Sequence, residues 1–598
     1  MPRSVARTLL AGALTLALAL LLTACGSGGD DKGGSTADSS TAVRGDNGAG
    51  GSRGGVLRVI TEEDLDSPLD SGHTYSASTF NLLSGTVRPL FRYTPDNPER
   101  SVPDLAAAPA DVSADGRTVT VRIRRGVRYS PPVNREVVAR DVKYAIERGF
   151  NPSVASGYAG VYYGDVIGAD RADGGPIAGI TTPDDQTIVF RLNRPTGGIL
   201  AEALVLPLSA PVPPEVARRY DARPVGGYST YAAHQAATGP YMFDARADGT
   251  VQGVGIVPGR RYVLRRNPNW DPATDDRPAY LDGLEWSVGN DPNVAGRQVL
   301  DGNGMNLGDT PTAAIIKRAV QQSPDQIFFS PGGGNRYAAI NTQVAPFDDA
   351  DLRKAVIAAT DRDQMRLVRG GRLLGDVATH FLYPGVPGFE EAGGLEGTGA
   401  DFLAAPSGDP EVARKYMVAA GYPDGRYTGD ETITIVGDSG DPSDKDAELV
   451  DAAVRSLGFR TRLLLVDSNT MYGRYCQSPS ARVNICPNIG MSRDFADAQT
   501  VLDAAFNGTS ISRQDGSNPN ISQLDDPAIN AAMKRAELVV DPQERAQAWG
   551  RIDQMITETG AAIPWLWDNQ PVVSSKDVRC ANQLWNQGHC DPAFSSLR

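Results

Sequence analysis

Short runs of alternating apolar and polar residues make up most of the chain, and their period changes from that of strands to that of helices. Val56–Ile60 is rich in branched residues and predicts a strand. Apolar residues alternate with polar ones over Arg117–Tyr129, which predicts an amphipathic strand. A helix over Ala139–Phe150 and a strand over Thr187–Leu192 follow. The first third of the chain is therefore expected to mix strands and helices.

Three helices in the second half of the chain carry clear start signals. Asp349, Asp409 and Asp541 each stand where a side-chain oxygen can accept a hydrogen bond from the first turn of a helix. Asp409 and Asp541 are followed by Pro, which suits the first helical position. The apolar residues after Asp349 recur at helical spacing. This helix is therefore expected to bury one face.

One segment indicates the topology of a sheet. Thr432–Val436 is a predicted strand, Lys445–Leu457 a predicted helix and Thr461–Val466 a second predicted strand. This order forms a β-α-β unit, whose two strands are parallel and joined by a right-handed crossover. Parallel sheets of this kind bind ligands beyond the carboxyl ends of their strands. The sequence therefore predicts an α/β fold with its binding site at such an edge.

The amino terminus has the features of a targeting segment. Arg3 and Arg7 precede an unbroken run of low polarity over Leu9–Leu22. Because a membrane-spanning helix needs about 20 apolar residues, this shorter run is typical of a secretion signal. The sequence Leu-Thr-Ala-Cys that ends at Cys25 resembles the bacterial lipobox, in which the cysteine is acylated. An ordinary signal peptide with a chance cysteine is the alternative.

These features divide the beginning of the chain. Residues 1–24 are expected to be a lipoprotein signal peptide, and residues 25–55 the lipidated cysteine with a flexible tether. The tether is almost entirely Gly, Ser, Asp, Thr, Asn and Ala, and cannot bury enough apolar surface to fold. The protein is therefore expected at the cell membrane, anchored by lipid on the extracytoplasmic face.

Charge and cysteine content narrow the class of protein. The 598 residues carry a formal net charge of −14, which disfavours nucleic-acid binding because the phosphate backbone selects basic surfaces. Four cysteines remain after Cys25, an even number that suggests disulfides in an exported protein. Their spacing favours two local bridges, although four cysteines allow three pairings. The pairs are Cys476 with Cys486 and Cys580 with Cys590.

Motifs for catalysis or metal binding are weak. A Gly-x-Ser-x-Gly match at residues 50–54 lies in the tether, without the strand and helix that a nucleophile elbow requires. The sequence has no His-Glu-x-x-His motif and no phosphate-binding loop, and its four histidines are scattered. We therefore expect no enzyme activity, no cofactor and no metal.

Several short motifs, in order along the chain, resemble the peptide/nickel family of ABC-importer solute-binding proteins (bacterial extracellular family 5). The resemblance covers roughly residues 56–575. It rests on residues 112–118, 123–129, 139–142, 237–241, 266–270, 339–342, 352–356, 361–362, 420–425 and 562–564.

The resemblance implies a two-lobed, type II periplasmic-binding-protein-like fold with a hinge and an extra inserted subdomain. Lobe I would comprise 56–297 and 562–598, with the subdomain at 81–224, and lobe II would span 298–561. The chain would cross between lobes near Val299–Leu307 and near Ile563–Trp567. A monomer would capture a peptide-like ligand between the lobes and deliver it to the importer's permease subunits.

The resemblance also implies ligand-binding residues. In peptide-binding members an Asp that matches Asp494 pairs with the free amino terminus of the ligand, while Arg493 could meet a carboxylate. Tyr75, Tyr337 and Asn341 are expected to line the cleft. The segment around Asp494 lacks the family's usual Trp and Pro. The alternatives are therefore a turn-capping Asp494, and a non-peptide solute (a metal chelate or an oligosaccharide) or a signalling peptide as ligand.

Overall fold

The computed structural model describes residues 50–598, except 63, 67, 75, 96, 309, 514, 517 and 584–588. The predicted signal peptide, Cys25, most of the predicted tether and Tyr75 thus lie outside the described residues. No helix among the described residues is long and apolar enough to cross a membrane.

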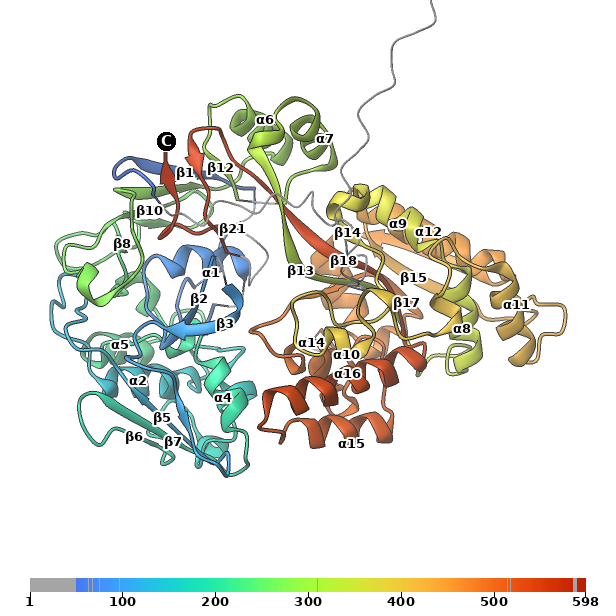
Figure 1. Ribbon diagram of the computed structural model, residues 1–598, viewed down its shortest axis with the longest axis horizontal. Coiled ribbons are helices and arrows are strands. Elements are labelled where there is room, and N and C mark those ends of the chain that lie inside the picture. Colours follow the sequence, from blue (N-terminus) through green and yellow to red (C-terminus); the bar gives the residue numbers. More distant parts are fainter. Residues whose placement is uncertain are drawn as a thin grey trace, which may run out of the picture. The chain divides into compact units, whose positions relative to one another are not determined.

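Lobe I is built on a mixed sheet, and the carboxyl-terminal end of the chain lies beside it in space (Figure 1). Strand β1 pairs in parallel with β11 on one side and with the edge strand β12 on the other. Alternate residues of β1, Leu57 and Val59, are buried, as the branched pattern predicts. The strands run in the order β12 (Asn306–Leu307), β1 (Val56–Ile60), β11 (Gly283–Ser287), β10 (Arg261–Arg266) and β8 (Tyr241–Phe243), with β9 (Ile256–Val257) beside β10; the helices are α1 (Ala77–Ser84), α6 (Pro292–Leu300) and α7 (Ala313–Gln322).

A subdomain is inserted after α1 and contains its own antiparallel sheet. The predicted amphipathic strand is present as β5, shorter than expected, and the predicted helix as α2. The sheet order is β4 (Asp111–Val112), β5 (Thr118–Arg122), β7 (Thr187–Arg191) and β6 (Ile180–Thr181); β2 (Phe91–Thr94) pairs with β3 (Asn97–Pro103); the helices are α2 (Ala139–Gly149), α3 (Ala159–Tyr163), α4 (Gly197–Ala203) and α5 (Pro214–Asp221).

A buried ionic cluster fixes this subdomain to lobe I. Arg148, in α2, donates to Asp70 at 2.8 Å and to Asp221 at 2.7 Å, and all three side chains are buried. Asp70 lies in the loop before α1, while Asp221 ends α5. Because removing one partner would leave an uncompensated buried charge, the cluster holds these three elements in one arrangement.

Lobe II has a second mixed sheet covered by most of the remaining helices (Figure 1). All three helices with predicted Asp caps are present, and each cap accepts from the first helical turn. The strands run in the order β14 (Gly375–Asp376), β18 (Ala562–Val573), β13 (Ile327–Ile340), β17 (Ile485–Met491), β15 (Thr432–Asp438) and β16 (Arg460–Val466); the helices are α8 (Ala350–Ala359), α9 (Arg362–Arg369), α10 (Phe389–Ala392), α11 (Pro410–Ala419), α12 (Ser443–Ser456), α13 (Ser468–Thr470), α14 (Gln499–Phe506), α15 (Pro527–Ala536) and α16 (Pro542–Glu558).

The predicted β-α-β unit is confirmed. Strands β15 and β16 are parallel over their full length, from Thr432 opposite Arg460 to Asp438 opposite Val466, and α12 connects them. Strand β17 is parallel to β15, so both strands end at the same edge of the sheet. The loop that follows β17 therefore lies at the edge where parallel sheets bind ligands.

Two long antiparallel strands, β13 and β18, connect the lobes and lie side by side in Figure 1. Their residues 327–329 and 572–573 pack in the cores of lobe I, while 337–340 and 562–566 pack in those of lobe II. The pairing is irregular between Ser330 and Gly334, where Gly332 and Gly334 adopt positive φ angles. Glycine tolerates such angles without the Cβ clash of other residues.

The lobe boundaries differ from the expected ones. The chain crosses near Ser330–Gly334 and again near Asp568–Gln570, rather than near Val299–Leu307 and Ile563–Trp567. The first expected crossing is wrong because β12 pairs with β1 inside lobe I. The second is displaced because residues 562–567 complete the sheet of lobe II.

Both predicted cysteine pairs lie at disulfide distance. The Sγ atoms of Cys476 and Cys486 are 2.06 Å apart, and those of Cys580 and Cys590 are 1.92 Å apart. The first pair joins the turn after α13 to β17. The second lies in the carboxyl-terminal segment, where β19 (Val578–Arg579) pairs with β22 (Ser596–Leu597) and β20 (Asn582–Gln583) pairs with β21 (His589–Cys590).

Candidate functional site

The loop between β17 and α14 brings lobe II into contact with the inserted subdomain. Phe495 and Ala496 are buried in the hydrophobic core of that subdomain. The Phe495 ring meets the Tyr162 ring edge-on, with centroids 4.8 Å apart. The backbone N–H of Ala496 donates to the Tyr93 hydroxyl at 2.9 Å. The loop thus places Asp494 directly at the contact between the two parts.

Asp494 is enclosed there by tyrosines. The hydroxyl groups of Tyr162 and Tyr158, four residues apart at α3, donate to its carboxylate. Burial raises the pKa of Asp494 to about 6, although these two hydrogen bonds act in the opposite direction. A carboxylate in such surroundings is stabilised by a cation that enters with it. The site is therefore suited to a positively charged group.

The alternative role of Asp494, as a cap for the turn before the following helix, is filled by another residue. The residue that accepts from the backbone N–H of Gln499, at the start of α14, is Asp497. Asp497 also forms an ion pair with Arg545 of α16 at 2.6 Å. Asp497 thus organises the turn, and Asp494 points to the subdomain instead.

A cavity with about 560 Å³ of empty volume opens beside Asp494. It lies between the segment around α3 and the start of α14, and it contains a second carboxylate, that of Asp503. None of the described residues that line it is basic. The lining residues are Gly157, Tyr158, Val161, Tyr162, Met491, Ser492, Asp494, Gln499, Thr500, Asp503 and Ala504.

A second cavity, with about 530 Å³ of empty volume, lies on the other side of the same loop. It contains Glu202 of α4, whose pKa is raised to about 7 by burial and by the nearby charge of Asp497. Its other walls come from α16 and the segment before it, including Arg545 and Trp549. The loop is therefore flanked by hollow space on two sides.

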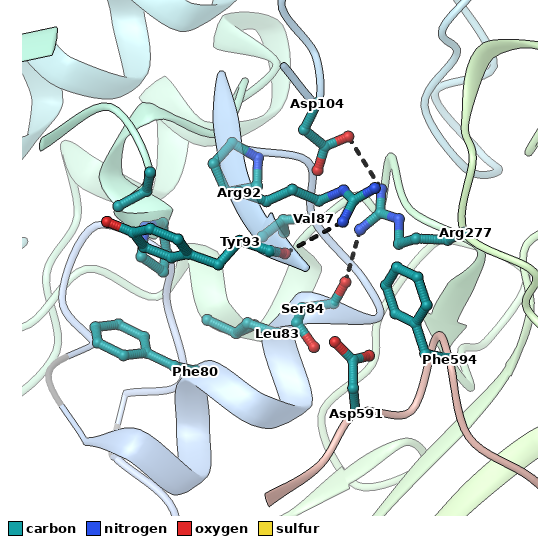
Figure 2. A pocket seen from close by; sticks show the side chains of 13 residues that line it. Phe80, Leu83, Ser84, Val87, Arg92, Tyr93, Asp104, Arg277, Asp591 and Phe594 are labelled. Atoms are coloured by element: carbon teal, nitrogen blue, oxygen red, sulfur yellow. Dashed lines mark hydrogen bonds and ion pairs between the residues drawn. The ribbon is translucent and has the colours of Figure 1, made fainter. Parts of the chain in front are cut away.

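A third cavity, of about 550 Å³, lies around α1 in lobe I (Figure 2). Its lining is largely apolar, and its arginines bind neighbouring groups. Arg277 donates to Asp104 at 3.2 Å and to the Ser84 carbonyl at 2.9 Å. Arg92 donates to the Tyr93 carbonyl at 3.2 Å and stacks on the Phe594 ring. These ion pairs and hydrogen bonds stabilise lobe I.

The other predicted site residues lie elsewhere. Arg493 is buried; its backbone N–H donates to the Tyr383 hydroxyl and its guanidinium to the Gly385 carbonyl. Tyr337 lies in the core of lobe II against Phe381 and Phe506.

Asn341 accepts from the backbone of Gln343 in a turn, beside a small cavity next to the Cys476–Cys486 bridge. Arg493, Tyr337 and Asn341 are all absent from the lining of the Asp494 cavity. Their expected contacts with a ligand have no support from these positions.

Among the lining residues of this cavity that the sequence did not predict are Tyr158, Tyr162 and Asp503. One signal was available for the tyrosines: a spacing of four residues places both on one face of a helix. Their rings stack with centroids 6.0 Å apart. Among the described residues, no group of three or more His, Cys, Asp or Glu side chains is arranged to hold a metal ion.

Comparison with known proteins gives the family. The family model of the bacterial extracellular solute-binding proteins, family 5, matches residues 100–517. Similar curated proteins include a di/tripeptide-binding protein 2 of Pseudomonas aeruginosa, 25% identical over 86% of this chain and 88% of that protein. A heme-binding protein A of Haemophilus influenzae is 24% identical over 76% of each chain.

Solved structures agree with this result. The structure of clavulanic acid biosynthesis oligopeptide binding protein 2 superposes with a TM-score of 0.79 at 27% identity, over 93% of this chain and 99% of that one. A murein tripeptide binding protein of Escherichia coli shares the fold, with a TM-score of 0.68 at 18% identity over 91% and 98%. The fold is therefore that of the type II periplasmic binding proteins, and the chain belongs to the bacterial extracellular solute-binding proteins, family 5.

Proposed function

We propose that this protein is an extracytoplasmic, lipid-anchored binding protein that captures peptides between its lobes and delivers them to an ABC importer. The observation that carries the proposal is the position of Asp494. Its carboxylate lies where lobe II meets the subdomain, bonded to two neutral hydroxyl groups in a cavity without a basic lining residue. The names of the relatives, which bind di- and tripeptides or oligopeptides, support the same ligand class.

An α-ammonium group suits this carboxylate for a physical reason. A cation enclosed between lobes loses its water and needs a charged partner with hydrogen-bond acceptors. Asp494 supplies that partner, and the tyrosine hydroxyls hold the carboxylate in place. The free amino terminus is common to all unmodified peptides. A site that recognises it can bind peptides that differ in the rest of their sequence.

Capture between lobes follows from the two crossing strands. The irregular pairing at Ser330–Gly334 gives β13 a place to bend between the two lobes. A ligand that contacts both Asp494 of lobe II and α3 of the subdomain favours the closed conformation, in which the loop of Asp494 and α3 meet. Permease subunits would recognise that arrangement.

A non-peptide solute is the second candidate, favoured by the heme-binding relative. The segment around Asp494 also lacks the family's usual Trp and Pro. A solute without an amine would leave the Asp494 carboxylate unpaired, so the two candidates differ in one measurable property. Only the peptide candidate requires a free amine.

Replacing Asp494 tests the amine requirement. The Asp494→Asn variant should bind a free-amine tripeptide with an affinity roughly 200- to 5000-fold lower, because loss of one partner of an enclosed ion pair costs about 3–5 kcal/mol. Isothermal titration calorimetry measures this difference. The N-acetylated peptide should bind wild-type protein as weakly as the variant binds the free peptide.

The exposed Glu558, changed to Gln, is the matched control for loss of one negative charge and should leave affinity unchanged. Equal binding of free and acetylated peptide by the wild type would contradict the ammonium assignment and favour the non-peptide candidate.

The pH dependence of binding gives an independent check. Asp494 has a pKa of about 6 without ligand, and an ammonium partner lowers it because it stabilises the ionised form. Peptide binding should therefore release a proton at acid pH. Affinity should be full above about pH 7 and fall by about tenfold per unit below about pH 6. Asp494→Asn should show a shallower slope; an equally steep slope would assign the effect to another group.

Membrane attachment is tested at Cys25, outside the described residues. Cys25→Ala removes the acyl acceptor and should move the protein from the membrane fraction to the soluble fraction. Ser27→Ala, two residues further on, preserves the acceptor and serves as the control. Retention of the Cys25→Ala protein in the membrane fraction would refute the lipid anchor.

A further inference from the structure

We propose that the Asp494 cavity selects peptides whose first residue is Lys or Arg, with Asp494 holding the α-ammonium group and Asp503 the cationic side chain. This inference rests on the proposed function and specifies its ligand class. Both carboxylates line one cavity, with about 560 Å³ of empty volume. They come from consecutive parts of the chain, the loop after β17 and the helix α14.

The Asp503 carboxylate has little compensation from its surroundings. Among the described residues it accepts one side-chain hydrogen bond, from Asn507 at 2.7 Å. Burial raises its pKa to about 6, and the negative charge of Glu537 acts in the same direction. The Asn507 hydrogen bond and the charges of Arg194 and Arg545 act in the opposite direction.

The two nearby arginines are already engaged. Arg194 donates to Asp165 at 2.8 Å and to Glu537 at 2.7 Å. Arg545 pairs with Asp497 at 2.6 Å. Neither arginine lines the cavity, whose described lining contains two carboxylates and no basic side chain. The electrostatic balance of the cavity therefore favours a ligand that brings two positive charges.

The remaining walls suit a long basic side chain. Tyr158 and Tyr162 present aromatic rings, and Val161 and Met491 add apolar surface. Lys and Arg bury their apolar stems along such surfaces while the charged end reaches a polar partner. Aromatic faces also attract these cations. The cavity that contains the two carboxylates thus also offers apolar and aromatic surface for an alkyl chain.

Calorimetry with matched peptides tests the inference. The probes are Lys-Ala-Ala and norleucine-Ala-Ala, whose first side chains share the same alkyl chain and differ in the terminal charge. A five-residue version of each peptide is measured as well. Wild-type protein should bind the Lys peptide roughly 10- to 100-fold more tightly than the norleucine peptide. Asp503→Asn should abolish this preference, so that the variant binds the Lys and norleucine peptides with affinities within about twofold of each other.

The exposed Asp525, changed to Asn, controls for long-range electrostatics and should keep the preference. Wild-type protein alone gives a second readout, which does not depend on any variant. Near pH 5, the Lys peptide should release more protons on binding than the norleucine peptide, as measured by titration in buffers of different ionisation enthalpy.

The outcomes separate this inference from the proposed function. Equal affinity and equal proton release for the two peptides, both bound, would overturn the basic-residue preference but leave the peptide function intact. A preference that survives in Asp503→Asn would overturn the assignment to Asp503. Failure of wild-type protein to bind any free-amine probe would overturn the proposed function, and the inference with it.

Discussion

The antiparallel pairing of β13 with β18 is the constraint on which the arrangement of both lobes depends. These strands pair from residues 327 and 573 to residues 339 and 562, and they contribute to the cores at both ends. Within one continuous ladder, the irregular step at Ser330–Gly334 separates the part that belongs to lobe I from the part that belongs to lobe II. The chain crosses twice at adjacent places, so the lobes share a single connection of two strands.

The same ladder positions the candidate site. Strand β17 pairs with β13, and its last residues lead into the loop that carries Asp494. The Cys476–Cys486 bridge fastens β17 to the preceding turn. Insertion of Phe495 and Ala496 into the subdomain core leaves Asp494 half-buried, and this desolvation raises its pKa. The loop is held at its start by the disulfide and at its tip by the subdomain core, and it presents a carboxylate that a cation would stabilise.

Local chemistry in the sequence predicted much of the fold. The Asp caps, the β-α-β unit and the local cysteine pairs depend on residues close in the chain, and the structure contains all of them. Strand pairing between residues that are far apart in the sequence could not be predicted in this way. Residues 562–564 were recognised as part of a family motif, but nothing local shows that residues 562–567 complete the sheet of lobe II.

The candidate site shows the same difference between local features, which the sequence predicts, and long-range contacts, which it does not. Asp494 was predicted from a family motif, yet its tyrosine partners lie more than 300 residues earlier in the chain. Tyr337 was expected in the cleft, but the register of β13 shifts beside it and its ring packs into the core. In a strand, a shift of one position turns a side chain from one face of the sheet to the other. The sequence alone therefore could not decide which face Tyr337 occupies.

Native mass spectrometry of the protein purified from its own host, without added ligand, tests the central claim most directly. We expect bound species that are released on activation, fragment at amide bonds and carry a free amino terminus. Bound species that do not fragment as peptides, or peptides with blocked amino termini, would contradict it.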